Sequence, residues 1–258
     1  MIELFTDLHR HRELIWALAL KELKLRYKRS VLGFLWALLN PALLMLVLTV
    51  VFANLMVFRT PHYAIFLLTV LLPWTFFGQT ISYAAESIVG NGDLIKKVAT
   101  SKIVFPLAAV ISNLINLLLS LIPLAILVLA LRHPFYLTWL YLPVPLIALT
   151  IFTAGVTFFF ATANVYYRDV SHIVQILLQV LFYVTPIIYG LDFFPVKYRW
   201  LFKLNPLVDL LDGFRKAVYD GTLPSVESIV TSFVCAFLAL IIGFAFFRRH
   251  QDEFVFYV

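Results

Sequence analysis

Six long stretches without a charged residue constrain the fold of this chain more than any other feature. The 258 residues include 20 Lys and Arg and 14 Asp and Glu, and all of them lie outside these stretches. A helix of about 20 apolar residues spans the hydrocarbon core of a bilayer, whereas transmembrane strands alternate apolar and polar residues, which these stretches do not. The sequence therefore predicts an all-α integral membrane fold with six transmembrane helices, at residues 31–58, 60–85, 103–131, 133–167, 170–191 and 228–247.

The composition excludes a water-soluble enzyme. Hydrophobic residues make up 62% of the chain and charged residues 13%, against about 45–50% and about 25% in a soluble domain. The surface of a soluble fold could not be covered with polar groups at this composition. We therefore expect one transmembrane domain over residues 1–258, with spans one to five within residues 31–191.

The distribution of Lys and Arg predicts the orientation of the spans. Seven of the 20 precede the first span, and further clusters precede the third span and follow the sixth. The Lys and Arg residues in the loop 192–227 are balanced by Asp and Glu residues in the same loop. Because Lys and Arg accumulate on the cytoplasmic side, both termini are expected in the cytoplasm, with residues 248–258 as a cytoplasmic tail. The net charge of +6 is attributed to topology, and no nucleic-acid partner is predicted.

The segment before the first span, residues 1–30, carries an apolar stripe beside a basic face. Trp16, Leu20, Leu23 and Tyr27 recur at helical spacing, which predicts an amino-terminal interfacial helix at the inner leaflet. A basic flank that only fixes orientation is the alternative. Because clustered cations attract lipid phosphates, we also predict a lipid-headgroup site at Lys24, Arg26, Lys28 and Arg29. The alternative is that these four residues only fix the orientation of the chain.

A short helix is predicted between spans two and three. Gly90-Asn91-Gly92 favours a turn, and Asp93 is a suitable cap for the helix that follows. An apolar face on a short cytoplasmic helix suits docking of another protein, while packing against the chain's own membrane domain is the alternative. The predicted docking site comprises Asp93, Leu94, Ile95, Lys96, Lys97 and Val98.

The loop 192–227 is too short for a domain and too apolar to be solvated throughout. Asn205-Pro206 predicts a helix start, and the residues that follow form one apolar stripe. We predict two short outer-leaflet helices between spans five and six that close the outer mouth of a channel. The predicted outer gate comprises Phe193, Phe194, Trp200, Leu207, Leu211 and Phe214.

The predicted spans contain no ionisable carboxylate, lysine or arginine, which argues against ion-coupled transport. HExxH and GxxxxGK[ST] motifs are also missing from the sequence, so neither a metal site nor nucleotide hydrolysis is predicted. Uncharged polar side chains instead recur at helical spacing. Hydrogen bonds between helices are one explanation. A pathway for a neutral, hydroxyl-rich solute is the other, and its predicted residues are Trp36, Asn40, His172, Gln175, Gln179 and Tyr183.

Several blocks in fixed order carry a family resemblance. They are KELKLRYKRSVLGFLW at 21–36, followed by asparagine and proline at 40–41, LIKKV at 94–98, NVYYRDV at 164–170, TPIIY at 185–189, YRW at 198–200, LNPL at 204–207 and FR at 214–215. The chain resembles the polysaccharide-export permeases of the type-2 ABC transporter class. Among these it is most similar to O-antigen exporter permeases, with teichoic-acid exporter permeases as near relatives.

The resemblance implies a homodimer that encloses one channel, bound to two copies of a separate P-loop ATPase subunit. ATP and Mg are expected on that partner, and no cofactor is expected on this chain. The implied cargo is a lipid-linked polysaccharide, undecaprenyl-pyrophosphate-linked in the O-antigen case, and the implied location is the cytoplasmic (inner) membrane. The family's coupling helix falls on residues 93–101, its gating helices on 193–219 and its interfacial helix on 13–29. A membrane-embedded enzyme acting on lipid-linked sugars, and a passive pore, are the alternatives.

Overall fold

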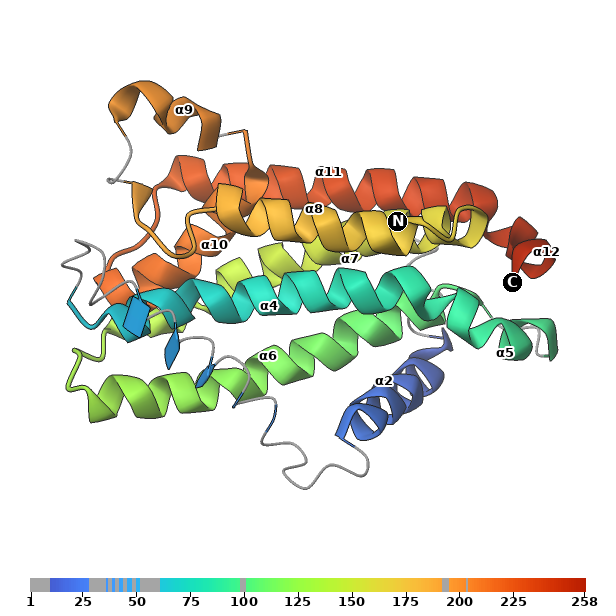
Figure 1. Cartoon of the computed structure of the whole chain (residues 1–258), viewed down its shortest axis with the longest axis horizontal. Coiled ribbons are helices and arrows are strands. Elements are labelled where there is room, and N and C mark those ends of the chain that lie inside the picture. Colours follow the sequence, from blue (N-terminus) through green and yellow to red (C-terminus); the bar gives the residue numbers. More distant parts are fainter. Residues whose placement is uncertain are drawn as a thin grey trace.

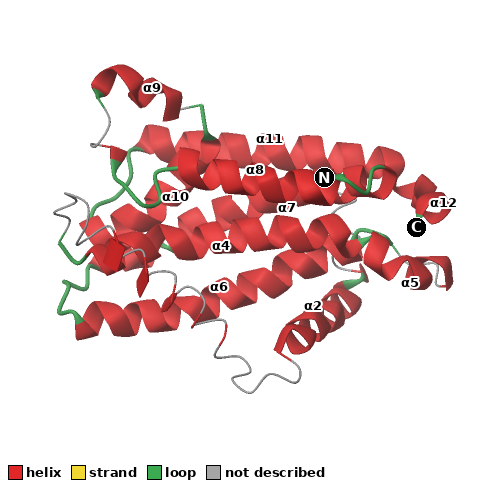
Figure 2. Ribbon diagram, viewed as in Figure 1, coloured by secondary structure: helices red, strands yellow, loops and turns green. Residues whose placement is uncertain are grey.

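The computed structural model describes residues 10–27, 61–97, 101–191, 195–202 and 204–258, together with scattered positions between Trp36 and Val51. Within these residues every regular element is a helix, as Figure 2 shows. The all-α prediction is therefore confirmed for the part of the chain that the structure describes.

Long helices form the body of the molecule, and most of the other elements lie at its two ends (Figure 1). The long helices are α4 (Tyr63–Ser87), α6 (Val104–Ala130), α7 (Pro143–Tyr166), α8 (Val170–Val184) and α11 (Val226–His250). The other elements are α2 (Arg12–Tyr27), η2 (Val89–Asn91), α5 (Gly92–Lys97), η3 (Leu137–Tyr141), η5 (Val196–Tyr198), α9 (Arg199–Phe202), α10 (Pro206–Arg215), the π-helix η6 (Lys216–Asp220), η7 (Gln251–Glu253) and α12 (Phe254–Tyr257). Of these, α2 packs on the side of the body against α6, and the remaining short elements lie at the two ends.

Helices α5 and α12 lie at one end of the bundle, and α9 and α10 lie at the other (Figure 1). We call these the α5 end and the α10 end. Helix α4 lies in the middle of the long helices, because it contacts α6, α7 and α8 and most of its side chains are buried. Helix α11 packs along α7.

Among the residues that the structure describes, four helical segments are long and apolar enough to cross a membrane. They correspond to the predicted second, third, fourth and sixth spans, and they are Tyr63–Ser87, Val104–Ala130, Leu137–Tyr166 and Val226–Tyr257. The predicted first span, 31–58, lies outside the described residues except for scattered positions. The count of six spans therefore stays a prediction.

The predicted fifth span is shorter as a helix than expected. Helix α8 has 15 residues and ends at Val184 instead of continuing to residue 191. Thr185 adopts extended backbone, with φ −90° and ψ 135°, because a residue that precedes proline is disfavoured in the helical region. Pro186 and Ile187 then continue as a buried, non-helical segment, which membrane proteins tolerate where other protein surrounds it.

Two apolar clusters hold the helices together. The larger one joins α4, α6, α7 and α10. The second lies at the α5 end and joins α2, α5, α6, α7, α11 and α12 through side chains that include Ile15, Ile95, Phe105, Phe158, Phe247 and Phe254.

The predicted amino-terminal helix is present as α2, and residues outside the predicted apolar stripe pack it against the bundle. Ile15 and Ala19 are buried and Trp16 is 52% exposed, and α2 lies against α6. Ile15 and Ala19 are one helical turn apart, and the small side chain of Ala19 permits a close approach between helices. The interface of α2 with a membrane remains a prediction.

Two glycines allow α7 and α11 to approach each other closely. A Cβ atom built on Gly155 would overlap the backbone of Ala239, and one built on Gly243 would overlap the carbonyl of Gly155. Small residues at such crossings let helix backbones pack directly in membrane proteins. This crossing fixes the position of α11 relative to the rest of the bundle.

Candidate functional site

A surface groove of about 560 Å³ lies between α4 and α8. Helix α4 contributes a polar and aromatic face, and α8 contributes aromatic side chains and an amide. The lining residues are Leu71, Trp74, Thr75, Gly78, Gln79, Ser82, Tyr83, Leu178, Gln179, Phe182 and Tyr183. None of these side chains is charged, so the groove suits a ligand without charge.

Aromatic rings form much of the groove wall. The ring centroids of Trp74 and Phe182 are 5.8 Å apart, so these two residues connect α4 to α8 across the groove. Gly78 follows Trp74 by four residues on α4, where a methyl group would be 3.9 Å from the Leu178 side chain. Aromatic faces bind the apolar faces of flat or ring-shaped ligands, while their edges remain available to polar groups.

Two amides complete the groove. Gln79 on α4 and Gln179 on α8 each carry an acceptor oxygen and two donor hydrogens, and both line the groove. The Thr75 hydroxyl donates to the Leu71 carbonyl at 2.7 Å, so its hydrogen is already used within α4. Each amide can therefore bond ligand hydroxyls both as donor and as acceptor.

The structure divides the predicted pathway residues of α8. His172, Gln175, Gln179 and Tyr183 are all exposed, but only Gln179 and Tyr183 line the groove. Val174 is the single buried residue of α8, which places this helix at the edge of the bundle. The predicted pathway also includes two residues of the first predicted span. Trp36 is exposed, and Asn40 lies outside the described residues.

Sequence reasoning missed the α4 side of this groove. Thr75, Gln79 and Ser82 are spaced by four and three residues, with Tyr83 adjacent, and therefore share one helical face. The same search for polar side chains at helical spacing, applied to the stretch 60–85, would have found them.

The predicted helix start in the loop 192–227 is confirmed. Asn205 Oδ1 accepts a hydrogen bond from the Leu207 amide at 3.1 Å, and Pro206 occupies the first turn of α10. The predicted gate residues Leu207, Leu211 and Phe214 are buried within the bundle, because α10 packs against α4, α7 and α11. The apolar face of α10 thus packs on the bundle, and the position of α10 at the outer leaflet stays a prediction.

The other predicted gate residues are not part of that buried face. Trp200 lies on α9 and is exposed. Phe193 and Phe194 lie outside the described residues. An apolar stripe requires burial, but the stripe alone does not distinguish lipid from a neighbouring helix as the partner.

A buried arginine attaches α10 to the end of α8. Arg215 is 6% exposed, and its Nη2 atom donates to the carbonyls of Pro186 at 2.9 Å and Ile187 at 3.0 Å. Its guanidinium carbon also lies 4.0 Å from the Phe66 ring centroid. Burial lowers the pKa of Arg215 to about 10, so the side chain remains a cation at neutral pH. Arg215 thus satisfies carbonyls that the break in α8 leaves without helical partners.

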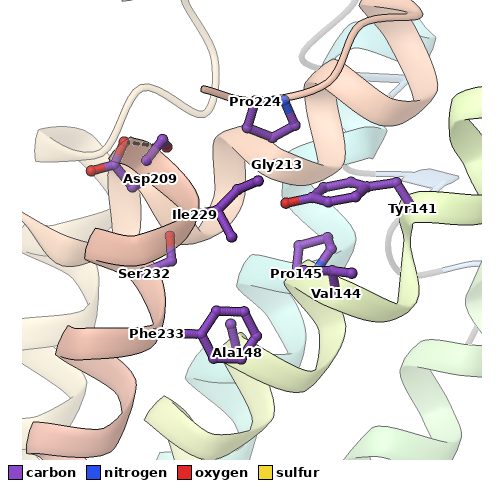
Figure 3. A pocket seen from close by; sticks show the side chains of 11 residues that line it. Tyr141, Val144, Pro145, Ala148, Asp209, Gly213, Pro224, Ile229, Ser232 and Phe233 are labelled. Atoms are coloured by element: carbon purple, nitrogen blue, oxygen red, sulfur yellow. Dashed lines mark hydrogen bonds between the residues drawn. The ribbon is translucent and has the colours of Figure 1, made fainter. Parts of the chain in front are cut away.

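A much smaller pocket separates α10 from α7 and α11 (Figure 3). Its volume is about 10 Å³, which suffices for a single water molecule. At its edge the Ser228 hydroxyl donates to the Asp209 carboxylate at 2.7 Å. This pocket is too small for a substrate.

The predicted docking helix is present as α5, with its apolar side chains turned toward the chain's own core. Ile95 is buried in the second cluster and Leu94 packs against that cluster, whereas Lys96 and Lys97 are exposed. For Ile95, the alternative of packing on the membrane domain is therefore correct. Val98 lies outside the described residues.

The role predicted for Asp93 as a cap is wrong. Helix α5 begins at Gly92, so exposed Asp93 lies within its first turn. A carboxylate in this position still stabilises the helix through the macrodipole.

The predicted lipid-headgroup residues are described only in part. Lys24 is exposed on α2, and Arg26 lies in the same helix. The Arg26 side chain, Lys28 and Arg29 lie outside the described residues. Within the described residues, no group of three or more His, Cys, Asp or Glu side chains could hold a metal ion.

Comparisons with known proteins assign the chain to a family. Residues 13–219 match the family described as ABC-2 type transporter. The chain is 36% identical to the O-antigen export system permease protein RfbA of Myxococcus xanthus, over 98% of each sequence. It is 32% identical to the protein of the same name from Klebsiella pneumoniae, over 94% of this chain and 93% of that relative. The polysialic acid transport protein KpsM of Escherichia coli is 26% identical over 92% of this chain and 93% of its own length. The chain therefore belongs to the ABC-2 type transporter family of membrane proteins.

Proposed function

We propose that this chain is the channel-forming permease subunit of an ATP-driven exporter that moves a lipid-linked, O-antigen-type polysaccharide across the cytoplasmic membrane. Similarity to two O-antigen export permeases over nearly the whole chain supports the class of cargo. The more distant polysialic acid transport protein also carries the name of a sugar polymer.

The observation that carries the proposal is the chemistry of the α4–α8 groove. A polysaccharide presents hydroxyl groups, which bond to amides, and apolar ring faces, which pack on aromatic side chains. Gln79, Gln179, Trp74 and Tyr183 supply both kinds of contact, and the lining contains no charged residue. A neutral lining binds each sugar weakly, and weak binding at many successive positions allows a polymer to move.

A second copy of the chain would convert the open groove into a closed channel. In one copy, α8 exposes an apolar surface that includes Ile176, Val180 and Tyr183. We propose a homodimer in which these helices face each other and enclose the polymer.

Energy must come from another subunit, because the sequence contains no P-loop motif. We propose that two copies of an ATPase, which hold ATP and Mg, dock at the α5 end. Exposed Asp93, Lys96 and Lys97 are available there. We propose that both termini face the cytoplasm, as the distribution of Lys and Arg predicts. We also propose that the basic residues Lys24, Arg26, Lys28 and Arg29 attract the pyrophosphate of the lipid carrier at the headgroup level.

Reversing the charge at both lysines, Lys96→Glu with Lys97→Glu, is expected to reduce co-purification of the cognate ATPase at least tenfold. Placing like charges against a complementary interface costs several kcal/mol, and every ~1.4 kcal/mol changes the affinity about tenfold. The matched control is Lys197→Glu. Lys197 is also exposed, but it lies in η5, directly before α9, at the α10 end of the bundle. Equal recovery of the ATPase with both variants would contradict docking at α5.

A further inference from the structure

We propose that residues 251–258, which we call the terminal brace, hold α5 against the junction of α7 and α8 and pass a displacement of α5 on to α8. The brace consists of η7 and α12 and follows directly after α11. It lies beside α5 at the α5 end of the bundle (Figure 1). Only the last step rests on the proposed function, because there an ATPase supplies the displacement.

The first contact of the brace is with the start of α5. Val258 lies directly over Gly92, where an added Cβ atom would be 3.2 Å from the Val258 Cβ and 3.4 Å from its carbonyl carbon. Gly92 is buried. The absence of a side chain at Gly92 therefore allows the brace to contact the backbone of α5.

The second contact is with the junction of α7 and α8, which comprises residues 166–169. The Tyr166 hydroxyl donates to the Glu253 carboxylate at 2.6 Å, and Arg168 Nη2 donates to the Tyr257 carbonyl at 2.7 Å. The rings of Tyr166 and Tyr257 also pack together, with centroids 4.7 Å apart. Three separate interactions thus fix the brace to the segment from which α8 begins.

Phe254 anchors the brace between these two contacts. Its side chain is 0% exposed and meets the Phe247 ring edge to face at a centroid distance of 5.4 Å. It belongs to the same apolar cluster as Ile95 of α5 and Val165 of α7. Two residues further on, Phe256 is 84% exposed. One turn of helix therefore offers a buried and an exposed phenylalanine as a matched pair.

The brace gives α5 a physical connection to the groove. Helix α8 begins at Val170, just after the junction held by the brace, and carries Gln179 and Tyr183 into the groove. Coupling between distant sites requires packed side chains or hydrogen bonds that bridge them. The brace, the junction and α8 form such a continuous path.

The first test measures the mobility of α5 in the purified chain, without any partner. A nitroxide is attached at Lys96→Cys in a Cys235→Ser background, since Cys235 is the one cysteine of the sequence. Phe254→Ala is expected to make the label more mobile, and Phe256→Ala is expected to leave the spectrum unchanged. Tyr166→Phe removes only the hydroxyl that binds Glu253 and keeps the ring, so it should shift the spectrum in the same direction by a smaller amount even if Phe254→Ala fails to fold. Unchanged mobility in Tyr166→Phe, or equal mobility in the two phenylalanine variants, would overturn the brace.

The second test measures transport by the complex with the cognate ATPase. Phe254→Ala is expected to retain the bound ATPase but to lower the polymer exported per ATP hydrolysed roughly tenfold, a typical size for coupling between sites. Phe256→Ala should export as the unmodified chain does. Export per ATP that is unchanged by Phe254→Ala would show that the path does not carry coupling. If the ATPase fails to bind even the unmodified chain, the proposed function fails, while the mobility of α5 still tests the brace.

Discussion

Replacing Gly155 with alanine is expected to abolish the folded protein. The added methyl group would overlap the backbone of Ala239 on α11. Gly243, which lies on the same face of α11 as Ala239, already contacts the Gly155 carbonyl. A backbone cannot rotate away as a flexible side chain does, so α7 and α11 would have to separate along their length. Overpacking a core typically costs about 1–3 kcal/mol even where side chains can yield. We expect a larger cost here, comparable with the roughly 5–15 kcal/mol that stabilises a typical domain.

Gly78→Ala is the matched control, because it adds the same methyl group at another contact between two helices, α4 and α8. At Gly78 the new atom would be 3.9 Å from the nearest side-chain atom, that of Leu178, which is an ordinary van der Waals distance. The measurement is the yield of monodisperse protein in detergent by size-exclusion chromatography. Normal yield of Gly155→Ala would show that the α7–α11 crossing is not packed as described.

Replacing both groove amides, Gln79→Leu with Gln179→Leu, is expected to reduce polymer export roughly ten- to hundredfold while leaving the protein folded. A hydrogen bond contributes about 0.5–1.5 kcal/mol net, so losing two amides removes up to about two powers of ten in affinity. Leucine is close in size to glutamine and is compatible with a membrane helix, which limits the effect on stability. Export is measured as surface polymer in cells, and the protein level is measured alongside.

Thr150→Val is the control for the amide variant. The Thr150 hydroxyl donates to the Leu146 carbonyl of its own helix at 2.7 Å, and this residue does not line the groove. Gln175→Leu distinguishes the groove from the longer α8 stripe. If the stripe carries the polymer, losing Gln175 matters as much as losing Gln179. If the groove does, Gln179 matters more. Wild-type export in the double variant would remove the groove from the pathway.

Much of the fold follows from where charges are excluded and where helices are capped. The uncharged stretches located the four long apolar segments, because burying a charge in hydrocarbon is costly. Asn205-Pro206 located the start of α10, because both the capping amide and the fixed φ of proline act within one turn. The family resemblance carried by blocks such as NVYYRDV and TPIIY is confirmed by the match over residues 13–219.

Other features depend on partners that the sequence does not identify. The stripe of α10 indicated a buried face, but not that α4, α7 and α11 would bury it. The early end of α8 follows from Pro186, which disfavours helical backbone at Thr185 although the apolar run continues beyond it. The groove required the pairing of α4 with α8, so the α8 side was predicted only in part and the α4 side was missed. The brace joins residues nearly 90 positions apart, such as Tyr166 and Glu253, and no local pattern indicates such a contact.

The central claim is that this permease moves its cargo only when a separate ATPase drives it. The direct measurement is uptake of lipid-linked O-antigen-type polysaccharide into the lumen of proteoliposomes that contain the chain together with its cognate ATPase, with and without ATP. Inward movement is counted only for permeases whose α5 end, and therefore whose ATPase, faces the added nucleotide. The account predicts polymer uptake with ATP and Mg, and no uptake without nucleotide or when the ATPase is omitted. Polymer accumulation against a gradient by the chain alone would contradict it.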